Sequence, residues 1–120
     1  MAAPNLLSLT TATGKTYFAN LVSSAGTNTT LLTTGSNQVY KINNITVSNI
    51  DATTGYDVTM YLANTTAVVS LAYQITVPAK SALVLTDKSG QFYLEENFQI
   101  QGGSTANNKL STTISYEVLS

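Results

Sequence analysis

The segment KLSTTISYEVLS, residues 109–120, shows the pattern that decides the fold class. Apolar or β-branched side chains alternate with polar ones along it, and one face of an extended chain carries Leu110, Thr112, Ile114, Tyr116 and Val118. Successive side chains of a β-strand point to opposite sides of its sheet. The segment therefore predicts a strand with one buried face and one solvated face.

Two central segments, YDVTMYLAN at 56–64 and AYQITVP at 72–78, show the same alternation and predict a hairpin. Each places its apolar side chains on one face, which we expect to be buried. Those side chains are Val58, Met60 and Leu62 in the first segment and Tyr73, Ile75 and Val77 in the second. Pro78 ends the second strand, because proline has no N–H to donate to a ladder.

The segment QVYKINNITVSNI, residues 38–50, changes phase along its length. Its apolar residues fall on even positions before residue 43 and on odd positions after residue 44. One extra residue moves every following side chain to the other face of a strand. We therefore expect a β-bulge, or a kink between two sheets, at Asn43 and Asn44.

Shorter alternating segments at 14–24, 29–35 and 81–87 complete the pattern, and the segment GGSTANN, residues 102–108, predicts a turn. No window shows the period of an amphipathic helix. About eight short strands can be counted, which predicts an all-β fold and a single antiparallel β-sandwich over residues 14–120. Residues 1–13 fit no clear strand and are expected to form an extended N-terminal arm.

The segment QFYLEENFQIQ, residues 91–101, places two adjacent glutamates inside an apolar run. A straight strand would point Glu96 into the core, where an unpaired carboxylate costs several kcal/mol. We therefore expect a turn at Glu95, Glu96 and Asn97 between two short strands, with both carboxylates facing water.

Composition argues against several classes of function. Of the 120 residues, 43% are hydrophobic and only 9% are charged, so the surface is polar but largely neutral. Such a surface is poorly protected against association, which indicates that partners cover much of it. All five basic residues are lysines scattered singly, so we expect no nucleic-acid partner. No segment approaches the ~18 apolar residues of a membrane span, so we expect no membrane partner.

Few side chains are available for catalysis. Histidine and cysteine are absent, which removes the commonest general base, the commonest nitrogen ligand of metals and the thiolate nucleophile. No spacing nominates a partner for Glu95 or Glu96 in a carboxylate dyad. We therefore expect neither enzymatic activity nor a cofactor. A calcium site at the turn flanked by Asp51 and Asp57 stays open, although aspartate in turns more often serves local hydrogen bonding.

The seven tyrosines differ in whether they share a face of their strand with the aliphatic side chains next to them. Tyr40, Tyr73 and Tyr116 alternate in step with aliphatic neighbours, so we expect them in the core. Tyr61 and Tyr93 fall out of step, on the expected outer face of their strands. Outward tyrosines suit a protein interface or, alternatively, the stacking of sugars.

Residues 38–120 also carry a series of strand and turn motifs: I-x-V-S-N-x-D at 45–51, V-x-M-x-L at 58–62, V-P-A-x-S-x-L-V-L at 77–85, L-E-E-N at 94–97 and I-S-Y-E at 114–117. Together they resemble small virion structural proteins of tailed bacteriophages, particularly those common among cyanophages. The resemblance implies an all-β module of the capsid exterior, neck or tail, without enzymatic activity or cofactor.

Composition and resemblance together predict a capsid decoration or cement protein that binds and stabilises the outer coat-protein lattice of a virion. Its partners would be the major capsid protein or other virion subunits, and homo-oligomerisation would add avidity. The candidate interface residues are the side chains of the arm and the two outward tyrosines: Pro4, Leu6, Leu7, Leu9, Tyr61 and Tyr93. A neck or tail component is the alternative in the same class, and a carbohydrate-binding or adhesion module is the alternative in another.

Overall fold

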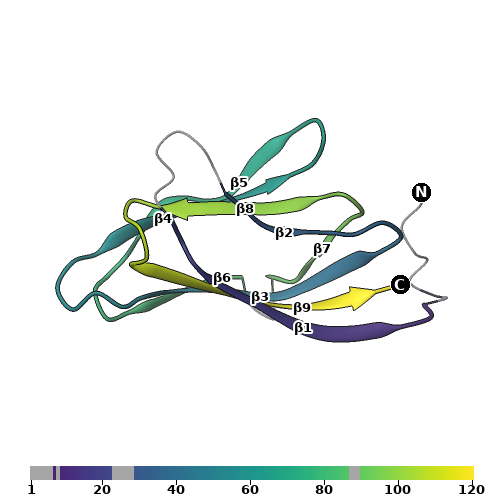
Figure 1. The fold of residues 1–120 in the computed structure, drawn as a ribbon, viewed down its shortest axis with the longest axis horizontal. Coiled ribbons are helices and arrows are strands. Elements are labelled where there is room, and N and C mark those ends of the chain that lie inside the picture. Colours follow the sequence, from purple (N-terminus) through teal and green to yellow (C-terminus); the bar gives the residue numbers. More distant parts are fainter. Residues whose placement is uncertain (1–6, 8, 23–28, 87–89) are drawn as a thin grey trace.

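The computed structural model describes residues 7, 9–22, 29–86 and 90–120, and their regular structure is almost entirely β-strand (Figure 1). Nine strands lie in this part of the chain: β1 Ala12–Asn20, β2 Thr29–Thr33, β3 Val39–Asn49, β4 Tyr56–Ala63, β5 Val68–Val77, β6 Ala82–Thr86, β7 Phe92–Leu94, β8 Gln99–Ser104 and β9 Leu110–Leu119. The predicted all-β fold class is confirmed.

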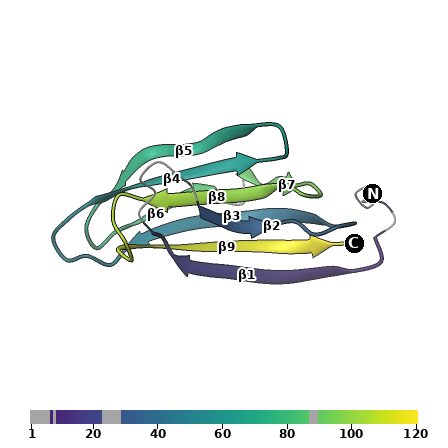
Figure 2. The ribbon, with the colours of Figure 1, turned by 45° about the horizontal axis from the view of Figure 1, so that its top comes forward.

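The strands form two antiparallel sheets. Sheet A has the order β1-β9-β3-β6, with β7 also paired to β3, and sheet B has the order β2-β8-β4-β5. In Figure 2, β5 runs along the free upper edge of sheet B. Buried side chains from both sheets form one core between them, so the predicted sandwich is confirmed.

The strand predicted from residues 109–120 lies in the middle of sheet A. β9 pairs with β1 on one side and with β3 on the other. All five side chains expected on its buried face are buried: Leu110, Thr112, Ile114, Tyr116 and Val118. The polar one, Thr112, donates its hydroxyl to the carbonyl of Thr46 over 3.3 Å. The ring of Tyr116 packs against that of Tyr40, with centroids 5.0 Å apart.

The phase change of residues 38–50 is a β-bulge inside β3. The pairing of β3 with β9 shifts between Ile42 and Asn44, which leaves Asn43 as the extra residue. Aliphatic side chains on both sides of the bulge therefore stay in the core, namely Ile42, Ile45 and Val47. The predicted bulge is confirmed.

The turn predicted at Glu95, Glu96 and Asn97 connects β7 to β8. The N–H of Phe98 donates to the carbonyl of Glu95 over 3.0 Å, and Asn97 has a φ of 65°, as the third position of a type II turn requires. Glu95 is exposed. The carboxylate of the half-buried Glu96, however, accepts a hydrogen bond from the backbone N–H of Asn37. The turn is confirmed, and its Glu96 carboxylate lies in an exposed hydrogen bond rather than in the core.

The two glycines at 102 and 103, predicted to lie in a turn, belong to β8. Gly102 pairs with Met60 of β4. A Cβ atom at Gly102 would lie 2.6 Å from the sulfur of Met60 and 3.1 Å from the carbonyl oxygen of Thr59. Glycine is therefore needed here for the close approach of neighbouring groups rather than for a turn.

The segment leading into β1 is held beside the end of β9. The N–H groups of Thr10 and Thr11 donate to the carbonyl of Ser120 over 2.6 and 2.9 Å, and the N–H of Ser120 donates to the carbonyl of Thr11 over 3.0 Å. Because β1 begins at Ala12, the last two residues of the segment expected as an arm are strand. Residues 1–6 and 8 lie outside the described residues.

Candidate protein interface

The exposed apolar side chains of the protein concentrate on β5. Of the eleven large apolar side chains exposed in the described residues, five lie on this strand, each between 39% and 60% exposed: Val68, Val69, Leu71, Tyr73 and Ile75. We call these five residues the β5 strip. No residue of β5 is charged, whereas charged residues commonly protect sheet edges from association. Exposed apolar side chains gathered on one edge strand make β5 a candidate contact surface.

Two register shifts each add one residue to β5, and the first of them moves Tyr73 off the core face. At one of them Gln74 has a φ of 49°, and its N–H donates to the hydroxyl of Thr59 over 3.1 Å. The extra residue breaks the alternation, so Tyr73 is exposed. Ile75 pairs with the buried Val58 but is still 41% exposed, so of the face predicted for this segment only Val77 is buried. The predictions that Tyr73 is a core residue and that Ile75 is buried are therefore wrong.

The same bulges influence how β5 could contact another protein. At the second shift, Leu71 has no partner on β4. An added strand needs an even row of N–H and C=O groups along the edge, and bulges interrupt that row. The β5 strip therefore favours docking through side chains over extension of sheet B by a further strand.

The loop that joins β4 to β5 is held by Asn64. The side-chain oxygen of Asn64 accepts the N–H of Thr66 over 2.8 Å, the N–H of Ala67 over 2.7 Å and the hydroxyl of Thr66 over 3.0 Å. The N–H of Asn64 donates to the carbonyl of Ala67 over 2.9 Å. The hairpin stands out at the top of Figure 1. Because its tip is already ordered, docking would lose little conformational entropy there.

The two tyrosines proposed from the sequence do not lie together. Tyr61 is half-buried on β4, and alternation places it on the face of sheet B opposite the core residue Met60. Tyr93 is 48% exposed on β7, next to the buried Leu94, and so lies on the outer face of sheet A. The two side chains are on opposite faces of the sandwich and cannot line a single site.

The residues proposed from the arm are described only in part. Leu7 is exposed and Leu9 is half-buried. Pro4 and Leu6 lie outside the described residues. The β5 strip was not among the predicted interface residues, although the sequence carries a signal for it. Residues 68–77 have apolar side chains at both odd and even positions and no charge, which is typical of a strand that is exposed at an edge and covered by a partner.

Asp51 organises the loop between β3 and β4. One carboxylate oxygen accepts the N–H groups of Thr53 and Thr54 over 2.8 and 3.0 Å. The other accepts the hydroxyl of Tyr56 over 3.3 Å and lies 3.5 Å from the ammonium nitrogen of Lys109. The backbone bonds from Thr53 and Thr54, helped by Lys109 and Tyr56, lower the pKa of Asp51 from 3.8 to about 2.

The carboxylates considered for calcium thus make local hydrogen bonds. Asp57 accepts the hydroxyl of Thr76 over 2.6 Å. Across residues 7, 9–22, 29–86 and 90–120, no three histidine, cysteine, aspartate or glutamate side chains form a group that could hold a metal ion. Within these residues, the structure therefore contains no cluster of side chains that would support the calcium site considered from the sequence.

No family model matches this chain, and neither a curated protein nor a solved structure is significantly similar to it. None of the described residues belongs to a helix that could span a bilayer.

Proposed function

We propose that this chain is a non-enzymatic structural protein of a tailed-bacteriophage virion, which decorates the capsid by docking the β5 strip on the outer surface of coat subunits. The observation that carries the proposal is the uncharged edge strand β5, with its five exposed apolar side chains. The proposal names a tailed-bacteriophage virion because residues 38–120 resemble small structural proteins of such virions. The proposal assigns the protein no catalytic role and no cofactor.

The energy for docking would come from removing the β5 strip from water, at about 25 cal/mol per Å² of apolar surface buried. Tyr73 is the best candidate for an anchor, because a large, rigid aromatic ring often dominates the energy of an interface. One strand provides a small contact area. Stable occupancy would then rest on repeated contacts across the lattice and on association between copies of the chain.

A second contact could come from the N-terminal segment. Thr10 and Thr11 are held at the end of β9 in sheet A, whereas the β5 strip follows the free edge of sheet B. The two regions lie on different parts of the molecule. An arm that bound one coat subunit while the β5 strip docked on another would join neighbouring subunits.

Two alternatives remain as proposals of lower rank. A neck or tail protein would use the same strip against a ring of subunits instead of a shell. A carbohydrate-binding module would need a polar site with an aromatic border, which the β5 strip does not provide because it has only one aromatic ring and no charge. Such a module would therefore use a surface other than β5.

The decoration proposal can be tested by adding the purified protein to virus particles that lack it and imaging them by electron cryomicroscopy. We expect copies over the whole capsid shell, with β5 facing the coat protein. Copies confined to one vertex or to a tail ring would show a neck or tail component instead, and absence of binding would contradict both.

A pair of matched variants tests the role of β5. Tyr73→Ser removes an aromatic ring that is 60% exposed, and Phe18→Ser removes one that is 76% exposed on β1, the edge strand of the other sheet. Both should fold normally, because neither ring is in the core. We expect Tyr73→Ser alone to reduce occupancy on particles. Reduced occupancy with Phe18→Ser alone would place the interface on β1.

A further inference from the structure

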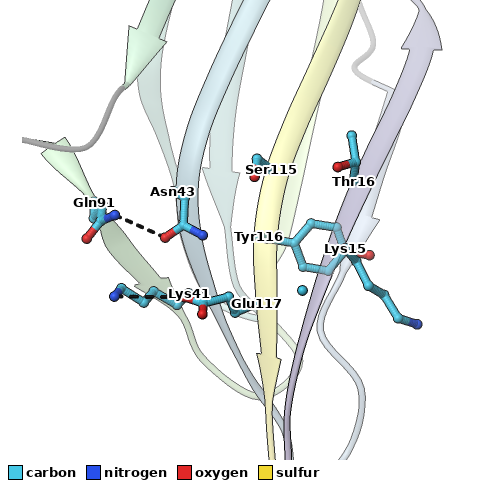
Figure 3. A pocket seen from close by; sticks show the side chains of 9 residues that line it. Lys15, Thr16, Lys41, Asn43, Gln91, Ser115, Tyr116 and Glu117 are labelled. Carbon is cyan, nitrogen blue, oxygen red and sulfur yellow. Dashed lines mark hydrogen bonds and ion pairs between the residues drawn. The ribbon is translucent and has the colours of Figure 1, made fainter.

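A polar depression of about 560 Å³ lies on the outer face of sheet A, the sheet that does not contain β5 (Figure 3). It is lined by residues of β1, β3 and β9 together with Gln91, which precedes β7. Its side chains are mostly amides, hydroxyls and charged groups. This surface is separate from the β5 strip and has the opposite chemical character.

Two local features of the strands form the depression. Asn43 is the extra residue of the bulge in β3, and bulges redirect side chains next to binding sites. In Figure 3 its amide nitrogen points toward β9. Gly14 of β1 pairs with Glu117, and a Cβ atom at Gly14 would meet no heavy atom within 4 Å. The missing side chain thus leaves open space beside Glu117.

The depression presents hydrogen-bond donors and acceptors in fixed positions. The ammonium nitrogen of Lys41 lies 3.8 Å from a carboxylate oxygen of Glu117. The amide nitrogen of Gln91 donates to the side-chain oxygen of Asn43 over 3.1 Å. This bond leaves the amide N–H groups of Asn43 and the side-chain carbonyl of Gln91 without a partner among the described residues. The hydroxyl of Ser115 adds a group that can both donate and accept.

An aromatic ring borders this group of polar side chains. Tyr93 pairs with Lys41 across β7 and β3, and Lys41 pairs with Glu117 across β3 and β9. These three side chains therefore follow one another on the outer face of sheet A. The charges of Lys41 and Glu117 compensate each other, and the end of the Lys15 side chain points away from them in Figure 3. The site as a whole favours an uncharged ligand.

We infer that this depression binds an uncharged, hydroxyl-rich saccharide. Sugar hydroxyls donate and accept at once, which matches the mixed groups of Lys41, Asn43, Gln91 and Glu117. The apolar face of a sugar ring can pack on Tyr93. Because the depression is open to solvent, we expect weak binding, with a Kd on the order of millimolar for a single chain. The inference goes beyond the proposed function and does not depend on docking through β5.

The test is a titration of the ¹⁵N-labelled full chain with neutral oligosaccharides of glucose, xylose and mannose, and with oligogalacturonate as the charged comparison, followed by amide chemical shifts. We expect at least one neutral oligosaccharide to give saturable shifts around residues 14–16, 41–43, 91 and 115–117. No saturable shifts with any neutral oligosaccharide, or shifts there with oligogalacturonate alone, would overturn the inference.

Three variants locate the site. Gly14→Val places a branched side chain in the depression, at a position where its Cβ atom meets no heavy atom within 4 Å, and should abolish the shifts. Asn43→Ala removes one hydrogen-bonding side chain and should weaken binding about ten-fold. Thr113→Ala, on the outer face of β9 outside the depression, should leave binding unchanged. The amide spectrum of each variant shows whether it is folded. A folded Gly14→Val protein that bound the same saccharide equally well would also overturn the inference.

Discussion

The N–H of Gln74 on β5 donates to the hydroxyl of Thr59 on β4 over 3.1 Å. Gln74 has a φ of 49°, a left-handed conformation that costs a residue with a side chain about 1–2 kcal/mol. The hydrogen bond to Thr59 helps to offset that cost. It therefore stabilises the bulge that brings Tyr73 to the surface.

Replacing Thr59 tests this relationship. Thr59→Val keeps the shape of the buried side chain but removes the hydroxyl, and we expect the free energy of unfolding to fall by about 1 kcal/mol. Thr59→Ser keeps the hydroxyl and should retain the hydrogen bond. Urea denaturation of the three proteins measures the difference. Equal stability of Thr59→Val and wild type would show that the hydroxyl does not support the bulge.

Replacing Gly14 or Gly102 by alanine should have different effects on the stability of the fold. Gly102→Ala would place a methyl group 2.6 Å from the sulfur of Met60, and we expect a loss of about 1–3 kcal/mol from overpacking. Gly14→Ala meets nothing within 4 Å and should change stability by no more than about 0.5 kcal/mol. Thermal unfolding of both variants checks the contrast, and an equal loss in both would contradict it.

Ile114 in the middle of β9 is fully buried. Ile114→Ala should reduce the free energy of unfolding by about 2–5 kcal/mol, because it leaves a cavity between the sheets. The neighbouring Thr113 points outward and is exposed, so Thr113→Ala should cost no more than about 0.5 kcal/mol. Chemical denaturation of this pair tests the assignment of the two faces of β9.

The lowered pKa of Asp51 predicts that the stability of the fold depends on pH. Its pKa is lowered from 3.8 to about 2 in the folded protein, so folding favours the ionised form. The stabilisation is fully present above the unfolded value of 3.8 and is lost as the pH falls through about 2. Asp51→Asn should therefore be less stable than wild type at neutral pH, and the difference should shrink across this acid range.

Urea denaturation at a series of pH values measures that difference. The bonds from Thr53 and Thr54 are the main cause of the lowered pKa, and salt screens the exposed charge of Lys109 more than it affects them. Most of the pH dependence should therefore persist at high ionic strength. If the free energies of unfolding of wild type and Asp51→Asn differed by the same amount at every pH, this account would be contradicted.

Alternation was sufficient to predict β3 and β9, because both strands have neighbours on each side and one face in the core. The bulge at Asn43 was visible because aliphatic residues flank it in opposite phases. The turn at Glu96 followed from the cost of burying a carboxylate, although its bond to Asn37 depends on a loop far away in the sequence.

The same reasoning failed for β5, which has a partner on one side only. Its register depends on a left-handed residue at position 74, and glutamine gives no turn signal in the sequence. The depression on sheet A was equally hidden, because it needs Gly14 to lie beside Glu117 and Asn43 to lie beside Gln91. Those neighbours follow from the pairing of distant strands, which local patterns do not specify.

The central place of β9 in sheet A also sets an order of assembly during synthesis. β9 leaves the ribosome after the other eight strands, and in the described residues it is the only strand that pairs with β1. Every strand of sheet B is complete before β9 is made, so that sheet can form while β1 is still unpaired. Closure of β1 on β9 joins distant parts of the chain and is expected to be slow. The segment that leads into β1 is therefore fixed in place only in the last step of folding.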